Sequence, residues 1–156
     1  MFVSAEKIAF KNEVKKACVA IIYERIKNAS NAMEQAQESA NNQEKSSVGD
    51  KHETARAIGQ AERDMNARQL LQAKEDLRFL ETIQIQKSFL NISTGSLFQI
   101  NEALFFVAVG LGSVKVTNKV VTVISHLSPL FGSLKMKKLG DTAVFQDKKI
   151  KIVDVY

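Results

Sequence analysis

The sequence contains very few of the residues that build disulfide-rich or loop-rich proteins. Its 156 residues include one cysteine, one proline, seven glycines and no tryptophan. With Cys18 as the single thiol, no disulfide can form within the chain, which excludes a disulfide-stapled secreted scaffold. We therefore expect Cys18 to be a buried structural thiol and the compartment to be reducing.

A long hydrophobic segment is also missing. Charged residues at Glu6 and Lys7 come too early for the apolar part of a signal peptide. The longest apolar run, residues 103–111, is too short to cross a bilayer as a helix. We predict a cytoplasmic protein with no membrane partner.

The excess of one charge sign is small, because 22 Lys and Arg stand against 17 Asp and Glu, for a net charge of +5. Such an excess is compatible with nucleic acid or an acidic protein partner and requires neither. A slightly basic solvated surface explains it as well.

Composition changes near residue 90. The single proline and five of the seven glycines lie beyond it, with most of the β-branched residues, whereas the earlier part is rich in Ala, Glu, Gln and Lys. A helical half followed by a sheet half is typical of the α+β class. We predict two domains, residues 1–90 and 91–156.

Two apolar seams indicate that residues 1–90 form a hairpin. In the first helix, small or apolar residues recur in steps of three or four, which places them on one side: Phe10, Val14, Cys18, Ile22, Ile26, Ala29, Met33, Ala36 and Ala40. A second series is Ile58, Ala61, Met65, Gln69, Ala73, Leu77 and Leu80. Joined by a short turn, these helices predict a long antiparallel coiled coil with its tip at residues 46–53.

The second half predicts a small, mostly antiparallel sheet. Its expected strands are residues 96–100, 103–109, 114–117, 120–124, 142–146 and 149–155. Between them, Ser128 followed by Pro129 indicates the start of a short helix packed against the sheet.

Two carboxylates mark the predicted tip. Asp50 and Glu53 stand at i and i+3, so on a first helical turn both leave the same face and can share one hard cation. The same spacing fits a capping box, since Ser47 precedes Asp50 by three residues and acids are favoured at a helix N-terminus. Spacing alone favours capping.

Other candidate chemistry is weaker. Four basic residues near the tip either guide it toward phosphates or form a solvated face: Lys51, Arg56, Arg63 and Arg68. A thiol enzyme would need Cys18 to meet His52 or His126, although Cys18 falls on the apolar seam. The Cys and His residues lack zinc spacing, so we expect no enzyme site of the chain's own.

Three short segments resemble the bacterial Gre transcript cleavage factors. Residues 49–55 are similar to the family's Gly-Asp-x-x-Glu-Asn-Ala tip, and residues 123–130 to its Ile-Ser-x-x-Ser-Pro-Leu segment. Residues 137–144 resemble the Gly-Lys-Lys-x-Gly-Asp-x-Val that follows. The three matches occur in the family's order and span almost the whole chain.

The resemblance implies an FKBP-like C-terminal domain that docks on RNA polymerase near its secondary channel, with Ser128, Pro129 and Leu130 in or near the docking surface. The hairpin would enter the channel, where Asp50 and Glu53 would help to hold a Mg²⁺ shared with the polymerase, present only in the complex. The polymerase itself would then hydrolyse backtracked RNA during transcription. As a transcription factor of this kind, the protein is also expected to be associated with DNA binding.

The implied partners are RNA polymerase and the nascent RNA 3′ end, with Lys51, Arg56 and Arg63 near nucleic acid and no small-molecule substrate. One departure keeps a second function open. The family continues with Glu-Tyr after the tip alanine, whereas Ala55 here is followed by Arg56 and Ala57. The alternative is a regulator that occupies the channel and inhibits the polymerase without inducing cleavage.

Overall fold

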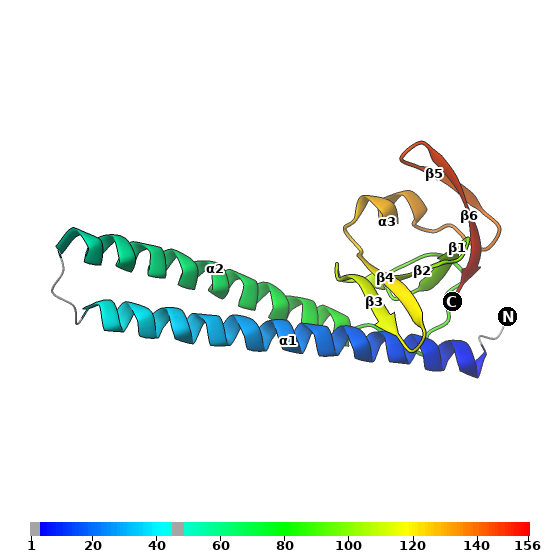
Figure 1. Cartoon of the computed structure of the whole chain (residues 1–156). Coiled ribbons are helices and arrows are strands. Elements are labelled where there is room, and N and C mark those ends of the chain that lie inside the picture. The colour runs from blue at the N-terminus through cyan, green and yellow to red at the C-terminus, as the bar shows by residue number, and fades with distance from the viewer. Residues whose placement is uncertain (1–3, 45–48) are drawn as a thin grey trace. The chain divides into compact units, whose positions relative to one another are not determined.

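The computed structural model describes residues 4–44 and 49–156, with side chains at 4–42 and 53–156. Helices α1 (Ala5–Glu44) and α2 (Gly49–Glu81) precede a mixed sheet that packs with one short helix, which confirms the predicted α+β class (Figure 1). The chain forms two compact units, Ile21–Leu77 and Met1–Ala20 with Arg78–Tyr156. No helix in the described part of the chain is both long and apolar enough to span a bilayer.

In the unit Ile21–Leu77, α1 and α2 run side by side as an antiparallel hairpin (Figure 1). The seam predicted for α1 is confirmed, because Ile22, Ala29 and Ala36 are buried. Toward the end of α1 the buried side chains shrink from isoleucine to alanine, so little apolar area is removed from water there. We infer that α2 is held more weakly near its start than near its end.

The seam predicted for α2 is wrong in its first half. Ile58 and Met65 keep 56% and 47% of their surface exposed, and Ala61 and Gln69 are also exposed. The inward positions form a different series, all buried or half-buried: Gly59, Arg63, Asn66, Leu70, Ala73 and Leu77.

The spacing of the buried residues on α1 explains why the seam predicted for α2 is wrong. From Ile22 to Ala40 its seam alternates steps of four and three residues, an average near 3.5 that belongs to a left-handed pair of helices. A paired helix must follow the same period, as the series from Gly59 to Leu77 does. The apolar stripe instead takes repeated four-residue steps back from Ala73, so it drifts out of the interface by one position by the time it reaches Ile58.

A groove of about 560 Å³ runs between the two helices. Its small apolar part is formed by alanines 29, 32 and 73, and the rest of its lining is polar: Arg25, Asn28, Asn66, Gln69, Gln72 and Asp76. Since most of these polar residues are exposed, the groove lies at the surface of the hairpin, beside the buried Ala29 and Ala73.

The other unit contains a six-stranded sheet in the order β3-β4-β2-β1-β6-β5. The strands are β1 (Leu97–Ile100), β2 (Ala103–Ala108), β3 (Gly112–Val116), β4 (Lys119–Ser125), β5 (Thr142–Phe145) and β6 (Lys148–Val155). All neighbouring pairs are antiparallel except β2 and β4, which are parallel. This pattern agrees with the predicted, mostly antiparallel sheet.

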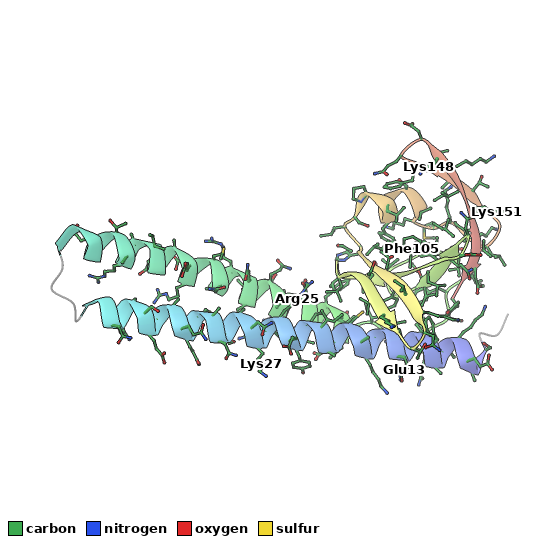
Figure 2. All side chains as sticks on the ribbon, in the orientation of Figure 1. Glu13, Arg25, Lys27, Phe105, Lys148 and Lys151 are labelled. Carbon is green, nitrogen blue, oxygen red and sulfur yellow. The ribbon has the colours of Figure 1, made fainter. Side chains whose placement is uncertain are left out.

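The core of this unit lies between the sheet and α3 (Pro129–Leu134). Phe98 is fully buried there and stacks on Phe105, with ring centroids 5.1 Å apart. Phe105 is labelled in Figure 2. From α3, Phe131 and Leu134 join the same cluster. The short helix is thus fixed by its two buried side chains, since six residues are too few to be stable alone.

Ser128 caps α3 as the sequence predicts. Its Oγ accepts a hydrogen bond from the Phe131 amide at 3.2 Å, and Pro129 occupies the first helical position. Replacing Ser128 with alanine should lower the free energy of unfolding by about 1 kcal/mol, because one amide of the first turn loses its acceptor. Urea titrations would measure this, with Ser133→Ala, inside the same helix, expected to cost less than half as much.

Candidate functional site

The acidic tip is described in part. Because α2 begins at Gly49, its backbone places positions 50 and 53 in the first turns of one helix. The Glu53 side chain is exposed. The side chains of Asp50 and Lys51, and the whole of residues 45–48, lie outside the described residues. The proposed use of Asp50 with Glu53 therefore stays a prediction.

The described basic residues behave differently from one another. Arg56 is exposed, whereas Arg63 turns toward α1, where its Nη1 donates a hydrogen bond to Gln37 Oε1 at 2.8 Å. Arg63 thus joins the two helices across the hairpin. Its predicted position near nucleic acid stays a prediction, and any contact with a phosphate would compete with the bond to Gln37.

The three residues predicted to dock on a partner differ in how much of each side chain is free to contact one. Pro129 is exposed, Ser128 uses its hydroxyl to cap α3, and Leu130 packs against the core of the sheet unit. Of the three side chains, that of Pro129 has the most surface for a partner. Ser128 and Leu130 would act by fixing its position.

Leu127 was missed by the sequence reasoning, although it is the more exposed neighbour. It keeps 81% of its surface in solvent, directly before the cap of α3. An apolar residue at this position usually packs on the fourth helical residue, which here is Gly132 and offers no side chain. That pairing of leucine with glycine was readable in the sequence and predicts an unpartnered Leu127.

An aromatic pair supports the same turn. The ring of His126 stacks on Phe79 from the end of α2, with centroids 4.3 Å apart and planes at 17°. The His126 amide donates a hydrogen bond to the Ala108 carbonyl at 3.3 Å. Leu127 and Pro129 therefore project from a turn whose backbone is held on two sides.

Cys18 has the surroundings predicted for a structural thiol. It is fully buried on α1, and burial raises its pKa to about 12. Since the thiolate is the nucleophile, a thiol with this pKa is almost entirely protonated at neutral pH. This finding argues against the thiol-enzyme alternative.

Among the described side chains, no group of three His, Cys, Asp or Glu residues is placed to hold a metal ion. The predicted tip pair fits Mg²⁺ in donor type, because carboxylate oxygens are its preferred protein ligands and Glu53 is open to solvent. One or two carboxylates leave most of an octahedral shell to water or to another molecule. The tip alone is therefore suited to sharing an ion with a partner.

A buried cation lies at the other end of α1. Lys11 keeps 1% of its surface exposed, and its Nζ donates to the main-chain oxygens of Lys87 and Tyr156, each at 3.3 Å. The Nζ also lies 4.5 Å from the centre of the Phe89 ring. Burial lowers the pKa of Lys11 from 10.5 to about 8.

This pKa predicts a rise in stability above neutral pH. Because the unfolded chain holds the Lys11 proton up to pH 10.5 and the folded chain releases it near 8, unfolding takes up a proton between these values and is disfavoured as pH rises. From pH 7 to 9 the free energy of unfolding should increase by about 1 kcal/mol. Lys11→Met should remove this increase, measured by urea unfolding at each pH.

Cys18 acts in the opposite direction and must be controlled. Its raised pKa means that stability is lost as pH climbs from 9 toward 12. The comparison is therefore made in a Cys18→Ala background and ended at pH 9. An equal rise with and without Lys11 would show that another group causes it.

No family model matches the chain, and no curated protein does. A solved structure described as "Structure of the transcription factor Gfh1" aligns over 90% of this chain and 94% of that chain, at 17% identity and a TM-score of 0.38. A likeness at this level carries no argument about function.

Proposed function

We propose that this protein is a transcription factor that binds RNA polymerase and stimulates hydrolysis of backtracked RNA by the polymerase active site. The observation that carries the proposal is Glu53, an exposed carboxylate in the first turns of α2, with Asp50 one helical turn before it in the sequence. The sequence resemblance to Gre factors over three ordered segments supports the same function.

The chain's own residues would contribute positions and charge. Glu53 and Asp50 would provide oxygen ligands for a Mg²⁺ shared with the polymerase, and a second metal in such a site activates water and stabilises phosphoryl charge. The helical backbone holds the two positions three residues apart, which limits how far the carboxylates can separate. Leu127, just before the cap of α3, and Pro129, the first residue of α3, are both exposed and would dock on the polymerase.

A specific sequence feature favours a second candidate function. Arg56 and Ala57 occupy the positions where the family has Glu and Tyr, so a positive charge replaces an acid near the tip. Opposite charge beside the carboxylates weakens their attraction for a cation. The second candidate is a polymerase regulator that occupies the same channel and slows RNA synthesis without shortening the transcript.

Stalled, backtracked elongation complexes with 5′-labelled RNA separate the two functions. With the protein and Mg²⁺ added, we expect shortened transcripts that the polymerase can extend again when nucleotides are supplied. Slower synthesis with full-length RNA would support the regulator. No binding to polymerase in a pull-down would overturn both.

A further inference from the structure

The net positive charge of the protein belongs to one of its two units. The sheet unit, Met1–Ala20 with Arg78–Tyr156, contains 14 Lys and Arg against seven Asp and Glu, a net charge of +7. The hairpin unit, Ile21–Leu77, contains eight against ten, a net charge of −2. A charge difference of this kind between two parts of one chain is typical of a protein that contacts a polyanion. The polyanion would be attracted to the sheet unit.

More than half of this charge follows α3. Residues 135–151 contain two aspartates and six lysines, for a net charge of +4: Lys135, Lys137, Lys138, Lys148, Lys149 and Lys151. Lys137 is half-buried and the other five lysines are exposed. In the described part of the chain, none of the six ammonium groups forms an ion pair. Asp141 instead accepts a hydrogen bond from the Lys138 main-chain amide at 2.9 Å.

The lysines at the start of α1 differ from these six because the fold uses their charge. Lys7 Nζ lies 2.8 Å from Asp154 Oδ2, and Lys15 Nζ donates a hydrogen bond to the Ile83 carbonyl at 2.9 Å. Together with the buried Lys11, they hold other segments of the sheet unit on α1. The ammonium groups of residues 135–151 hold no segment in this way, so the fold does not explain their charge.

The β5–β6 hairpin presents two of the six lysines on one face. Val144 pairs with Lys149 and Thr142 pairs with Lys151, so these four side chains leave the same side of the two strands. All four are exposed, whereas Ala143 on the other side is buried. Within this face the only charges are the two ammonium groups, whose Cα atoms are about 7 Å apart along β6.

The hairpin holds this face in a fixed geometry. Its turn residues Gln146 and Asp147 both have positive φ, 51° and 63°, as in the type I′ turn that suits two-residue hairpins. On its other side β6 pairs with β1. Figure 2 shows Lys148 at the end of the hairpin and Lys151 farther along β6. Three lysines are therefore carried by one well-paired strand.

Protection of the sheet edge does not account for these lysines. β5 is an edge strand, and lysines on an edge strand discourage pairing with other chains. However, the sequence of β5 contains no lysine, and Val144 on this strand is 66% exposed. The lysines lie on β6, which has a partner strand on each side. They are placed to contact a ligand that lies over the face.

The aromatic content of this region indicates which polyanion fits. Proteins that bind single-stranded nucleic acid stack its bases on accessible aromatic side chains. Among the described residues 135–156 the aromatic side chains are those of Phe145, which is half-buried, and Tyr156, which is buried. A duplex keeps its bases stacked inside and offers its phosphates, which lysines contact without reading the sequence.

We propose that the exposed face of the β5–β6 hairpin binds the phosphate backbone of a nucleic-acid duplex through Lys149 and Lys151, with Lys148 adding a third contact at the end of the hairpin. The binding is independent of base sequence. It does not rest on the proposed function, because it needs neither the tip acids nor RNA polymerase.

Fluorescence anisotropy of the full chain with a labelled DNA duplex of about 20 base pairs tests this site. Three phosphate contacts predict that the affinity falls about 40-fold between 50 and 200 mM salt. Lys149→Gln combined with Lys151→Gln removes two contacts, so the slope of log K against log salt should become shallower by about two. At about 50 mM salt the Kd should rise at least about tenfold. An unchanged Kd and slope would overturn the proposal.

Lys16→Gln combined with Lys115→Gln is the matched control. It removes the same charge from exposed positions on α1 and on β3, the opposite edge strand. We expect the Kd to change less than about threefold and the urea midpoints of both double variants to equal that of the unaltered protein. A loss of affinity as large as that from the β6 variant would show that net charge alone governs binding, and the assigned face would be wrong.

Other polyanions in the same assay test the class of ligand. An RNA duplex should bind within about threefold of the DNA duplex, because the contacts are to phosphates, and single-stranded DNA of equal length at least about threefold more weakly. A larger difference between the duplexes would mean that groups other than phosphates are recognised. Tighter binding of the single strand, or displacement of the duplex by polyglutamate at equal charge concentration, would assign the face to a different polyanion and overturn the proposal.

Discussion

Replacing both Asp50 and Glu53 with alanine should lower transcript cleavage by about 100-fold, while the affinity for RNA polymerase changes less than about threefold. The large effect is expected because the pair would act on a metal-bound transition state, where each tenfold loss of rate corresponds to about 1.4 kcal/mol. Docking would depend on other surfaces, including Leu127 and Pro129. Cleavage rates at saturating protein separate the two effects.

The matched control is the double substitution Glu34→Ala and Glu62→Ala. It removes the same two negative charges from exposed positions on α1 and α2. If this control lowered cleavage as strongly as the tip variant, net charge of the hairpin would be the cause. If the tip variant cleaved like the unaltered protein, the proposed role of Asp50 and Glu53 would be wrong.

The fold class followed from the sequence because strong local signals agreed with one another. Alternating apolar residues and well-placed turns marked the strands of the second half, and Ser128 with Pro129 marked the start of α3. Each of these signals acts over a few residues, within one element. The first helix was equally clear, since its seam from Val14 to Ala36 is apolar enough to identify its buried face.

The prediction of the α2 seam failed because the packing of α1 decides which residues of α2 are buried. Its own apolar stripe through Ile58 and Met65 is a reasonable helical face, and periodicity within α2 cannot reject it. The rejection comes from the period of α1, which brings Gly59 and Asn66 to the interface instead. A prediction that required the two helices to share one period would have found the observed series.

No local pattern around Lys11 indicates that its side chain is buried. A lysine between apolar positions on a helix is usually solvated at its ammonium end. Its burial depends on residues 87, 89 and 156, which approach only in the folded unit. Contacts between residues so far apart along the chain are not visible to local patterns. The exposure of Leu127 is different, because the glycine at position 132 already indicates that this leucine has no apolar partner on α3.

Truncating Phe98 to alanine should have the largest effect on stability, lowering the free energy of unfolding of the sheet unit by about 3–5 kcal/mol. The side chain is fully buried on β1, and Phe105 stacks on its ring. Removing the ring therefore leaves a cavity and also takes away the stacking partner of Phe105. The lost stacking adds to the free energy that is lost when less apolar surface is buried. An exposed valine on β5, Val144→Ala, should change stability by less than about 0.5 kcal/mol.

The absence of tryptophan makes tyrosine the natural probe for this measurement. Tyr156 is buried in the same unit as Phe98, whereas Tyr23 lies in the hairpin unit and is 55% exposed. In a Tyr23→Phe background, tyrosine fluorescence during urea unfolding reports on the sheet unit alone. Phe98→Leu, which keeps much of the apolar volume, should recover more than half of the loss. If Phe98→Ala and Val144→Ala shifted the transition equally, the cluster between the sheet and α3 would not be what stabilises this unit.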